Sequence, residues 1–313
     1  MLALLQTEAR QRGLPSCVLT FEPHPRDYFA AVTKKPDLAP ARIGTLRDKL
    51  SELAACGVAQ TIVLPFDARL ASRSPEEFIQ NVLIDGLGAH YVLVGDDFRF
   101  GAKRAGDYAM LDAAGDAHGF DVARMNSYEV HGLRVSSSAV REALAEGRMA
   151  DAHTLLGRPY AISGHVVHGR KLGRALGASA PGKDDGFRTL NLRFKHWKPA
   201  ASGIFAVLVH GLSERPLPGV ANLGVRPSLD ANDVNAGRVL LETHCLEWPS
   251  HLGAEGAYGK IVRVELLHKL HDELRYTSLE ALTAGIAKDG RDARAFFAST
   301  HAETHRQTTR DRI

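Results

Sequence analysis

The chain has 313 residues, enough for two domains that each bury a hydrophobic core. Hydrophobic residues make up 44% and charged residues 24%, as in ordinary soluble globular proteins. The formal net charge of +3 is too small to indicate binding to nucleic acid or to an anionic membrane, so the basic residues are expected to act locally, on small anionic ligands.

Cysteine usage and the start of the chain both bear on the compartment. Cys17, Cys56 and Cys245 are widely spaced and form no Cys-x-x-Cys pair. This predicts buried, reduced thiols rather than a disulfide framework or a zinc site. The apolar residues 1–5 are too few for a signal peptide, and no later stretch is long enough to span a bilayer. A cytoplasmic location is therefore expected.

Helical and strand patterns alternate in the first half of the chain. Helices are predicted over residues 3–12, 46–56 and 75–87, and strands over residues 17–21, 61–66 and 91–95. Ser74 before Pro75, with Glu77 three residues after Ser74, predicts a capping box at the start of the third helix. Continuous apolar strands between helices indicate a parallel sheet covered on both faces, whose ligands bind at the carboxyl ends of the strands.

The pattern changes near Arg158. Short strands separated by Gly and Pro turns are predicted at residues 160–168, 190–194, 204–210, 220–223, 239–245 and 261–267. They indicate a small antiparallel β-barrel. A last helix is predicted from Thr277, where Thr277 and Glu280 fit a capping box, and the polar residues after it are expected to be disordered.

Three polar features of the first half suit a nucleotide site. Asp97 and Phe98 lie in a Gly-Asp-Asp-Phe-Arg-Phe-Gly loop directly after a predicted strand, and His24 stands between two prolines at another strand end. Three serines at 136–138 begin a predicted helix, with Arg141 one turn further on. The N–H groups at a helix start and an arginine both bind phosphate oxygens. The bland alternatives are a charged surface loop and an ordinary serine cap.

A second cluster lies in the barrel half. Residues 169–177 combine three glycines with three cationic side chains after a strand, a composition that suits phosphate groups. Thr189 and Asn191 alternate on a predicted strand, so both face the same side and offer oxygen ligands to Mg²⁺. Glu242 is a carboxylate among apolar strand residues, either an outward-facing strand residue or a general base.

In this order and spacing the two clusters resemble the bacterial bifunctional riboflavin kinase/FMN adenylyltransferase family, also called FAD synthetase, from about Val18 to about Phe297. The resemblance implies a Rossmann-like nucleotidyltransferase domain of the α/β class over residues 1–157. It implies a riboflavin kinase β-barrel with a C-terminal helix over residues 158–300, and a disordered tail over residues 301–313. The implied substrates are riboflavin, FMN and ATP, with FAD as product and Mg²⁺ as cofactor.

The resemblance also implies the roles of individual residues. Glu242 would be the catalytic base, and Thr189 and Asn191 the Mg²⁺ ligands. The residues that would bind ATP or its phosphates are Gly169, Arg170, Lys171, Gly173, Arg174, Gly177, Ser136, Ser137, Ser138 and Arg141. The flavin-side residues would be His24, Asp97, Phe98, Asn222 and Arg226. No nucleic acid or membrane partner is implied, and the sequence leaves the oligomeric state open.

This sequence departs from the family pattern in both halves. The family begins with a strand and a Gly-x-Phe-Asp-Gly-x-His-x-Gly-His turn, whereas this sequence starts inside the helix that follows it. A missing first strand and lost adenylylation are therefore expected of the chain as given, and either the true start lies upstream or the first domain is a relic. Residues 178–186 are an insert in the kinase ATP loop, Arg188 replaces a proline, and His271 stands where the family has an arginine. A kinase-only enzyme and a catalytically silent flavin-binding protein are therefore kept as alternatives.

Overall fold

The computed structural model describes residues 1–125, 128–130, 132–168, 189–193, 198–225, 239–253 and 255–310, with the side chains of 301–310 left out. The chain forms two compact units. The first comprises Met1–Pro40 and Lys49–Arg134, and the second comprises Ala41–Asp48 and Val135–Ile313. Among the helices of the described ranges, none has the length and apolar character needed to cross a membrane.

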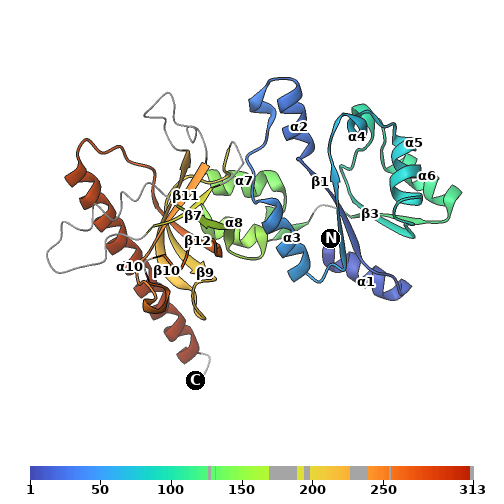
Figure 1. Cartoon of the computed structure of the whole chain (residues 1–313). Helices are drawn as coiled ribbons and strands as arrows, with labels where there is room; N and C mark the ends of the chain where they lie inside the picture. Colours follow the sequence, from blue (N-terminus) through green and yellow to red (C-terminus); the bar gives the residue numbers. More distant parts are fainter. Residues whose placement is uncertain are drawn as a thin grey trace. The chain divides into compact units, whose positions relative to one another are not determined.

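The first unit contains parallel strand pairs flanked by helices (Figure 1). β1 (Cys17–Glu22) pairs with β2 (Gln60–Pro65), and β3 (Tyr91–Gly95) pairs with β4 (Asp121–Met125), both in parallel. The short strands β5 (Glu129–Val130) and β6 (Leu133–Arg134) form a hairpin. The helices are α1 (Leu2–Arg12), α2 (Pro25–Val32), α3 (Leu46–Ala55), which crosses the boundary between the units, α4 (Ala68–Ser72), α5 (Pro75–Phe78), α6 (Tyr108–His118), and the short turns η1 (Pro36–Leu38), η2 (Ile79–Ile84) and η3 (Ala102–Arg104).

The expected parallel pairing is confirmed, but the expectation of one sheet is wrong for the described residues. The structure has two separate two-stranded parallel sheets, β1-β2 and β3-β4. A run of apolar residues predicts that a strand forms. It does not predict which strands lie beside it, which explains the error.

The capping box of α5 is confirmed. The Ser74 hydroxyl accepts a hydrogen bond from the Glu77 N–H, and the Glu77 carboxylate accepts one from the Ser74 N–H. The helix predicted over 75–87, however, changes at Ile79 into the wider π-helical turn η2. There the Asp85 N–H donates to the Gln80 carbonyl five residues earlier, and the Gln80 amide donates to the Asp85 carboxylate.

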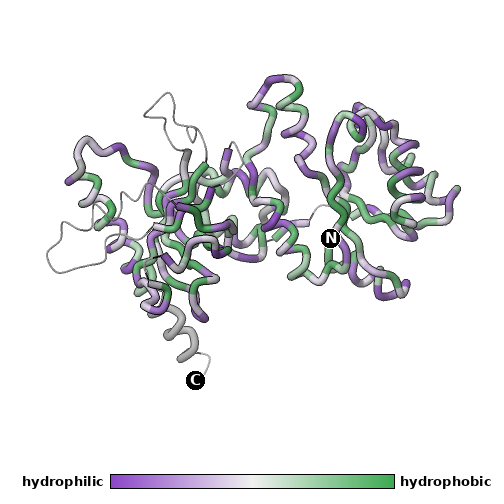
Figure 2. Tube along the Cα trace, in the orientation of Figure 1, coloured by the Kyte–Doolittle hydropathy of each residue, from purple (hydrophilic) through white to green (hydrophobic). Residues whose placement is uncertain are grey.

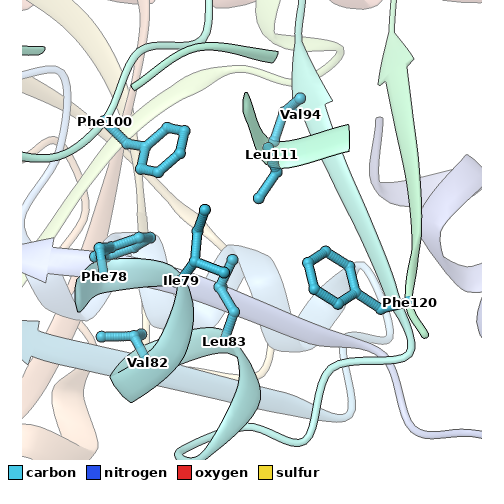
Figure 3. Packing of buried hydrophobic residues seen from close by; sticks show 8 residues of the cluster. All are labelled: Phe78, Ile79, Val82, Leu83, Val94, Phe100, Leu111 and Phe120. Atoms are coloured by element: carbon cyan, nitrogen blue, oxygen red, sulfur yellow. The ribbon is translucent and has the colours of Figure 1, made fainter. Parts of the chain in front are cut away.

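The wider turn serves the core of the first unit. Figure 3 shows side chains of α5 and η2 facing those of β3, of α6 and of the loops after β3 and α6. The buried members are Phe78, Ile79, Val82, Leu83, Val94, Phe100, Leu111 and Phe120. Burial of one such side chain contributes about 1.5–3 kcal/mol, so the eight together stabilise the first unit substantially.

The second unit contains a closed six-stranded barrel and a C-terminal helix, as the sequence predicted (Figure 1). The strand order is β10-β11-β8-β7-β12-β9. The strands are β7 (Tyr160–Val167), β8 (Thr189–Arg193), β9 (Gly203–His210), β10 (Leu217–Val225), β11 (Val239–Cys245) and β12 (Ile261–His271), and η4 (Ser250–Leu252) precedes β12. α7 (Ser137–Ala145) and α8 (Met149–Leu156) precede the barrel, and α10 (Leu279–Arg310) packs on β9, β10 and β12.

Alternation along the strands separates the inside of the barrel from its outer face. On β11, Val239, Leu241, Thr243 and Cys245 are at most 3% exposed, whereas the residues between them are half-buried or exposed. Figure 2 shows hydrophobic residues, in green, along the barrel strands. Because neighbouring residues of a strand point to opposite faces, the odd-numbered residues of β11 fill the interior and the even-numbered ones lie outside.

The start of α10 differs from the prediction by one residue. The Ser278 hydroxyl accepts a hydrogen bond from the Ala281 N–H at 3.1 Å, so Ser278 caps the helix in place of Thr277. Ser278 and Thr277 are both good caps, and the sequence does not separate adjacent candidates. The backbone of α10 continues to Arg310. The disorder expected for residues 301–313 stays a prediction.

A short segment from the first part of the sequence belongs to the second unit. Within Ala41–Asp48, the Ala41 carbonyl accepts from Nε of Arg141 at 2.7 Å, and the buried Asp48 carboxylate accepts from the Ser163 N–H at 2.9 Å. The boundary between the two units thus falls after Arg134, and residues 41–48 belong to the barrel unit. The domain limits 1–157 and 158–300 remain a prediction.

The three cysteines are free thiols, as expected, but they are not all buried. Cys245 is buried on β11 and Cys17 is half-buried on β1, whereas Cys56 is exposed after α3. The expectation of burial is therefore wrong for Cys56. A hydrophobic residue type does not reveal that its position follows the end of a helix, where the chain turns at the surface.

Candidate functional site

Strand register brings three of the predicted site residues together on the barrel. Asn191 of β8 pairs with Glu242 of β11, and Glu242 pairs with Asn222 of β10. Directly paired residues in antiparallel strands point to the same face of a sheet. Asn191, Glu242 and Asn222 therefore form one line across three strands, called the outer row below.

The outer row lies on the outside of the barrel. Glu242 is exposed and Asn222 is half-buried, while the residues on either side of each point into the core. Asn191 is only 4% exposed although it lies on the same face as Glu242. The row therefore places a carboxylate open to solvent between two amide side chains, one of which is enclosed.

A second pair extends the row on the same face. Thr189 pairs with His244, and each lies two residues from a member of the outer row. The Asn191 side-chain amide donates a long hydrogen bond of 3.4 Å to the Thr189 carbonyl. The Asn191 amide oxygen and the Thr189 hydroxyl take no part in that bond and are oxygen atoms that a ligand could contact. His244 was not named among the predicted site residues, although its two-residue spacing from Glu242 was a usable signal.

The Asn222 side chain carries an unsatisfied acceptor. Its Oδ1 atom is buried and has no hydrogen-bond partner within the described ranges. A buried polar atom left without a partner costs about 1–3 kcal/mol. A bound ligand with a hydroxyl or N–H donor at this point would recover that cost, so Asn222 is suited to ligand contact.

The outer row has the chemistry of a proton acceptor beside oxygen ligands. A carboxylate within reach of a substrate hydroxyl removes its proton as the oxygen attacks. Thr189 and Asn191 supply a hydroxyl and an amide oxygen, which are the hard donors that Mg²⁺ prefers. No group of three or more His, Cys, Asp or Glu side chains that could form a metal cage occurs in the part of the chain that the structure describes. The donor set of Thr189 and Asn191 would suit a hard cation that also binds a phosphorylated ligand, which stays a prediction.

Several predicted site residues lie outside the described residues. They are Gly169, Arg170, Lys171, Gly173, Arg174, Gly177 and Arg226, together with the insert at 178–186 and Arg188. Their assignments to ATP and flavin, and the effect of the insert, stay predictions.

In the first unit, the flavin-side candidates have local structural roles. His24 caps α2, because its Nδ1 accepts a hydrogen bond from the Arg26 N–H at 3.2 Å. Asp97 is exposed just after β3, at the carboxyl end of that strand. Phe98 stacks on Phe100 with 5.4 Å between the ring centroids and packs against the core.

The serine cluster begins α7, in the second unit. The Ser136 hydroxyl accepts from the Ala139 N–H at 3.1 Å, so it acts as the helix cap. Ser137 and Ser138 are exposed in the first helical turn. Arg141 donates from Nε to the Ala41 carbonyl at 2.7 Å. The serine cap that was the alternative interpretation is thus present, and phosphate binding at Ser136, Ser137, Ser138 and Arg141 stays a prediction.

Comparisons with known proteins agree with the two units. A family model described as FAD synthetase matches residues 1–139, and one described as riboflavin kinase matches residues 156–297. A solved structure from Streptococcus pneumoniae, titled as a macrolide-efflux protein, is similar with a TM-score of 0.67 and 24% identity over 94% of this chain and 88% of that chain. At that identity the likeness concerns the fold alone.

Curated relatives are similar over almost the whole chain. The bifunctional riboflavin kinase/FMN adenylyltransferase of Escherichia coli (strain K12) is 43% identical over 297 residues, covering 95% of this chain and 87% of the relative. Proteins of the same name from Pseudomonas fluorescens and Haemophilus influenzae are 40% and 38% identical, covering 95% and 94% of this chain and 88% of each relative. The resemblance inferred from the motifs is thereby confirmed, and this chain belongs to the bifunctional riboflavin kinase/FMN adenylyltransferase family.

Proposed function

We propose that the barrel unit phosphorylates riboflavin to FMN with ATP, as a step of flavin cofactor biosynthesis. The observation that carries this proposal is the outer row, in which strand pairing sets the Glu242 carboxylate between Asn191 and Asn222. The match of residues 156–297 to the riboflavin kinase family supports it.

Glu242 acts as the general base in this proposal. Its carboxylate accepts the proton of the terminal ribityl hydroxyl, whose oxygen forms a bond to the γ-phosphorus of ATP. The bond between that phosphorus and the bridging oxygen breaks, and ADP leaves with the electron pair. The exposed position of Glu242 on the outer face leaves room for a substrate hydroxyl to reach it.

In this proposal, riboflavin binds on one side of Glu242 and Mg-ATP binds on the other. Asn222, with its unsatisfied Oδ1, holds a donor group of the flavin substrate. Thr189 and Asn191 hold Mg²⁺ together with the ATP phosphates, and the ion when bound neutralises phosphate charge. Arg170, Lys171 and Arg174 are assigned to the same phosphates on sequence grounds.

We propose adenylylation of FMN to FAD as a second activity, carried by the predicted FMN adenylyltransferase domain, residues 1–157. The FAD synthetase match to residues 1–139 supports two activities over a kinase-only enzyme or a silent flavin-binding protein. The candidates for that reaction are His24, Asp97 and Phe98, and the serines and arginine of 136–141. The loss of adenylylation expected from the sequence stays a prediction, and the assay below decides it. Small-molecule substrates and free thiols are consistent with a cytoplasmic protein, and we propose the cytoplasm as the location of this protein.

The test supplies riboflavin and Mg-ATP and resolves FMN from FAD. The Glu242→Gln variant keeps the shape of the side chain and removes the base, so we expect the phosphorylation rate to fall about 10²–10⁴-fold with riboflavin binding retained. Glu247→Gln, an exposed glutamate just after β11, is the matched control and should behave like the parent. A Glu242→Gln protein turning over within about threefold of the parent would remove Glu242 from the mechanism.

A further inference from the structure

His271, the last residue of β12, lies two strands beyond the Asn222 end of the outer row. It pairs with Ile204 of β9, and Ile204 pairs with Asn222 of β10. The pairing through Asn191, Glu242 and Asn222 therefore continues across β9 to His271 on β12, where the register shifts between Lys269 and His271. This places the histidine on the Asn222 side of the row, the side proposed for the flavin.

Both ring nitrogens of His271 face hydrogen-bond acceptors. Nε2 lies 2.9 Å from Oδ1 of Asp289 on α10, and Nδ1 lies 2.6 Å from the carbonyl oxygen of Asp272. A neutral imidazole has one N–H and one lone pair, so it donates to only one of these oxygens. The arrangement is satisfied in full only by the protonated ring, which donates to both.

The charges around the ring agree with this geometry. Burial lowers the pKa of His271, but the hydrogen bonds to Asp289 and to the Asp272 carbonyl raise it, and the net direction is upward. Lys288 on α10 opposes the rise. Lys269, two residues before His271 on β12, is engaged by the Asp272 carboxylate at 2.5 Å. The ring is thus poised to lose its proton above the ordinary range of histidine.

The bridge made by His271 fixes the turn between β12 and α10. On one side of this turn, a Cβ built on Gly224 would lie 2.1 Å from Oε1 of Glu273, so the Glu273 carboxylate rests on the backbone of β10. On the other side, a Cβ built on Gly285 would lie 2.2 Å from the Tyr276 hydroxyl, so the Tyr276 ring rests on α10. Gly224 is two residues from Asn222 and shares its face. The turn therefore borders the Asn222 end of the outer row.

We propose that protonated His271 is a positioning residue for riboflavin phosphorylation, because its bridge from Asp289 to the Asp272 carbonyl holds the Glu273 carboxylate beside the Asn222 end of the row. This inference rests on the proposed kinase function. When the ring loses a proton, one nitrogen lone pair faces an acceptor oxygen and the turn loosens. Riboflavin then binds less tightly, whereas Mg-ATP, at the Thr189 and Asn191 end, is unaffected.

The experiment measures the KM of riboflavin, the KM of Mg-ATP and kcat between about pH 6 and pH 9, a range that spans histidine titration. For the parent, we expect the riboflavin KM to rise about tenfold as His271 loses its proton, the usual effect of one charge-assisted hydrogen bond. His271→Gln should have the high KM throughout, without a pH step. His271→Arg keeps a permanent cation, so it should keep the low KM at high pH.

Two further variants test whether the pH step comes from His271 itself. Asp289→Asn removes the charge that favours the protonated ring, so its step should move to lower pH. His153→Gln, which changes an exposed histidine on α8, is the control and should show the step of the parent. Thermal melting of each variant at both ends of the pH range verifies that all are folded.

Several outcomes would overturn the inference. One is a pH step in His271→Gln equal to that of the parent, and another is an equal rise in the KM of both substrates. Riboflavin binding without ATP, followed by flavin fluorescence, should show the same pH step. If the parent binds riboflavin with this step but transfers no phosphate, the kinase proposal fails while the positioning of the flavin by His271 stands. Binding without a step overturns the role of His271.

Discussion

At the residue scale, strand register decides which side chains act together. Thr189 and Asn191 are two residues apart on β8, and Glu242 and His244 are two residues apart on β11, so pairing sets the four side by side. A slip of one residue in this pairing would turn each of them to the other face of its strand. The strongly buried residues between them, such as Leu241, fix the register because they must stay in the core.

The metal assignment leads to a prediction for Thr189 and Asn191. Thr189→Ala and Asn191→Ala each remove an oxygen donor, and we expect the KM of Mg-ATP to rise about 10- to 100-fold, the worth of a bond to a charged group. The KM of riboflavin should change much less, because the proposed flavin position lies on the other side of Glu242. Steady-state kinetics at saturating partner substrate measure both constants. Ser202→Ala, at an exposed serine, is the control. Equal losses for both substrates would indicate a folding defect and remove the metal assignment.

The thiols should differ sharply in reactivity. Burial raises the pKa of the Cys245 thiol to about 12, so almost none of it is thiolate at neutral pH. Burial also raises the pKa of the half-buried Cys17, with a backbone hydrogen bond from Ile62 opposing. Cys56 is exposed. A chromogenic thiol reagent should therefore detect one fast thiol in the folded protein, absent in Cys56→Ser, and Cys245 only after unfolding in urea. Loss of the fast thiol in Cys245→Ser would contradict this prediction.

At the element scale, α6 shows why one helical glycine is required. A Cβ built on Gly115 would lie 2.4 Å from the Phe120 carbonyl oxygen, closer than real Cβ atoms approach. The same residue accepts hydrogen bonds at its carbonyl from the N–H groups of Gly119 and Phe120. The chain therefore turns back tightly onto α6 to start β4, and a side chain at Gly115 has no room.

Replacing this glycine tests packing against helix propensity. Alanine in a helix normally stabilises by about 0.5–1 kcal/mol relative to glycine. For Gly115→Ala we expect the contact with Phe120 to win, with a net loss of about 1–3 kcal/mol, the usual cost of overpacking. Urea unfolding followed by far-ultraviolet circular dichroism measures it. Ala113→Gly, on the exposed side of α6, reports the propensity alone. A Gly115→Ala protein more stable than the parent would show that the turn relaxes freely.

The elements that the sequence predicted well are those with a local cause. The capping box of Ser74 and Glu77 and the strands of the barrel follow from residue type and from alternation along the chain. The π-helical turn after Phe78 does not, because it depends on how Ile79, Val82 and Leu83 reach a core formed by distant elements. Local patterns carry no information about that distance.

The site divides in the same way. Glu242, Thr189 and Asn191 were predicted from spacing and from the resemblance, and the strand register places them side by side, while their roles stay predictions. The pair of His271 and Asp289 was not found, because its members lie on a strand end and on a helix whose packing the sequence does not give. A histidine and an aspartate eighteen positions apart carry no pattern that links them.

At the scale of the whole molecule, the order of residues along the chain and their membership of the two units differ. Ala41–Asp48 lies within the sequence of the first unit but belongs to the second. Asp48 is 8% exposed, and its carboxylate accepts hydrogen bonds from the Thr45 N–H and hydroxyl, both at 2.8 Å, and from the Ser163 N–H of β7 at 2.9 Å. One buried side chain thus joins the start of α3 to the first strand of the barrel.

A substitution at Asp48 should therefore weaken the barrel unit. Asp48→Asn keeps the size of the side chain but turns an N–H₂ group toward a donor, so we expect the free energy of unfolding to fall by about 1–3 kcal/mol, the cost of an unsatisfied buried group.

Trp197 and Trp248 both fall in the sequence of the second unit, so tryptophan fluorescence follows that unit during urea unfolding. With a urea dependence of about 2 kcal/mol per M, the midpoint should fall by about 0.5–1.5 M. Asp37→Asn, at an exposed aspartate in η1 of the first unit, is the matched control and should leave this transition unchanged. If Asp48→Asn leaves the fluorescence midpoint at the parent value, the segment 41–48 does not stabilise the barrel, and its hydrogen bond to Ser163 contributes little to the fold.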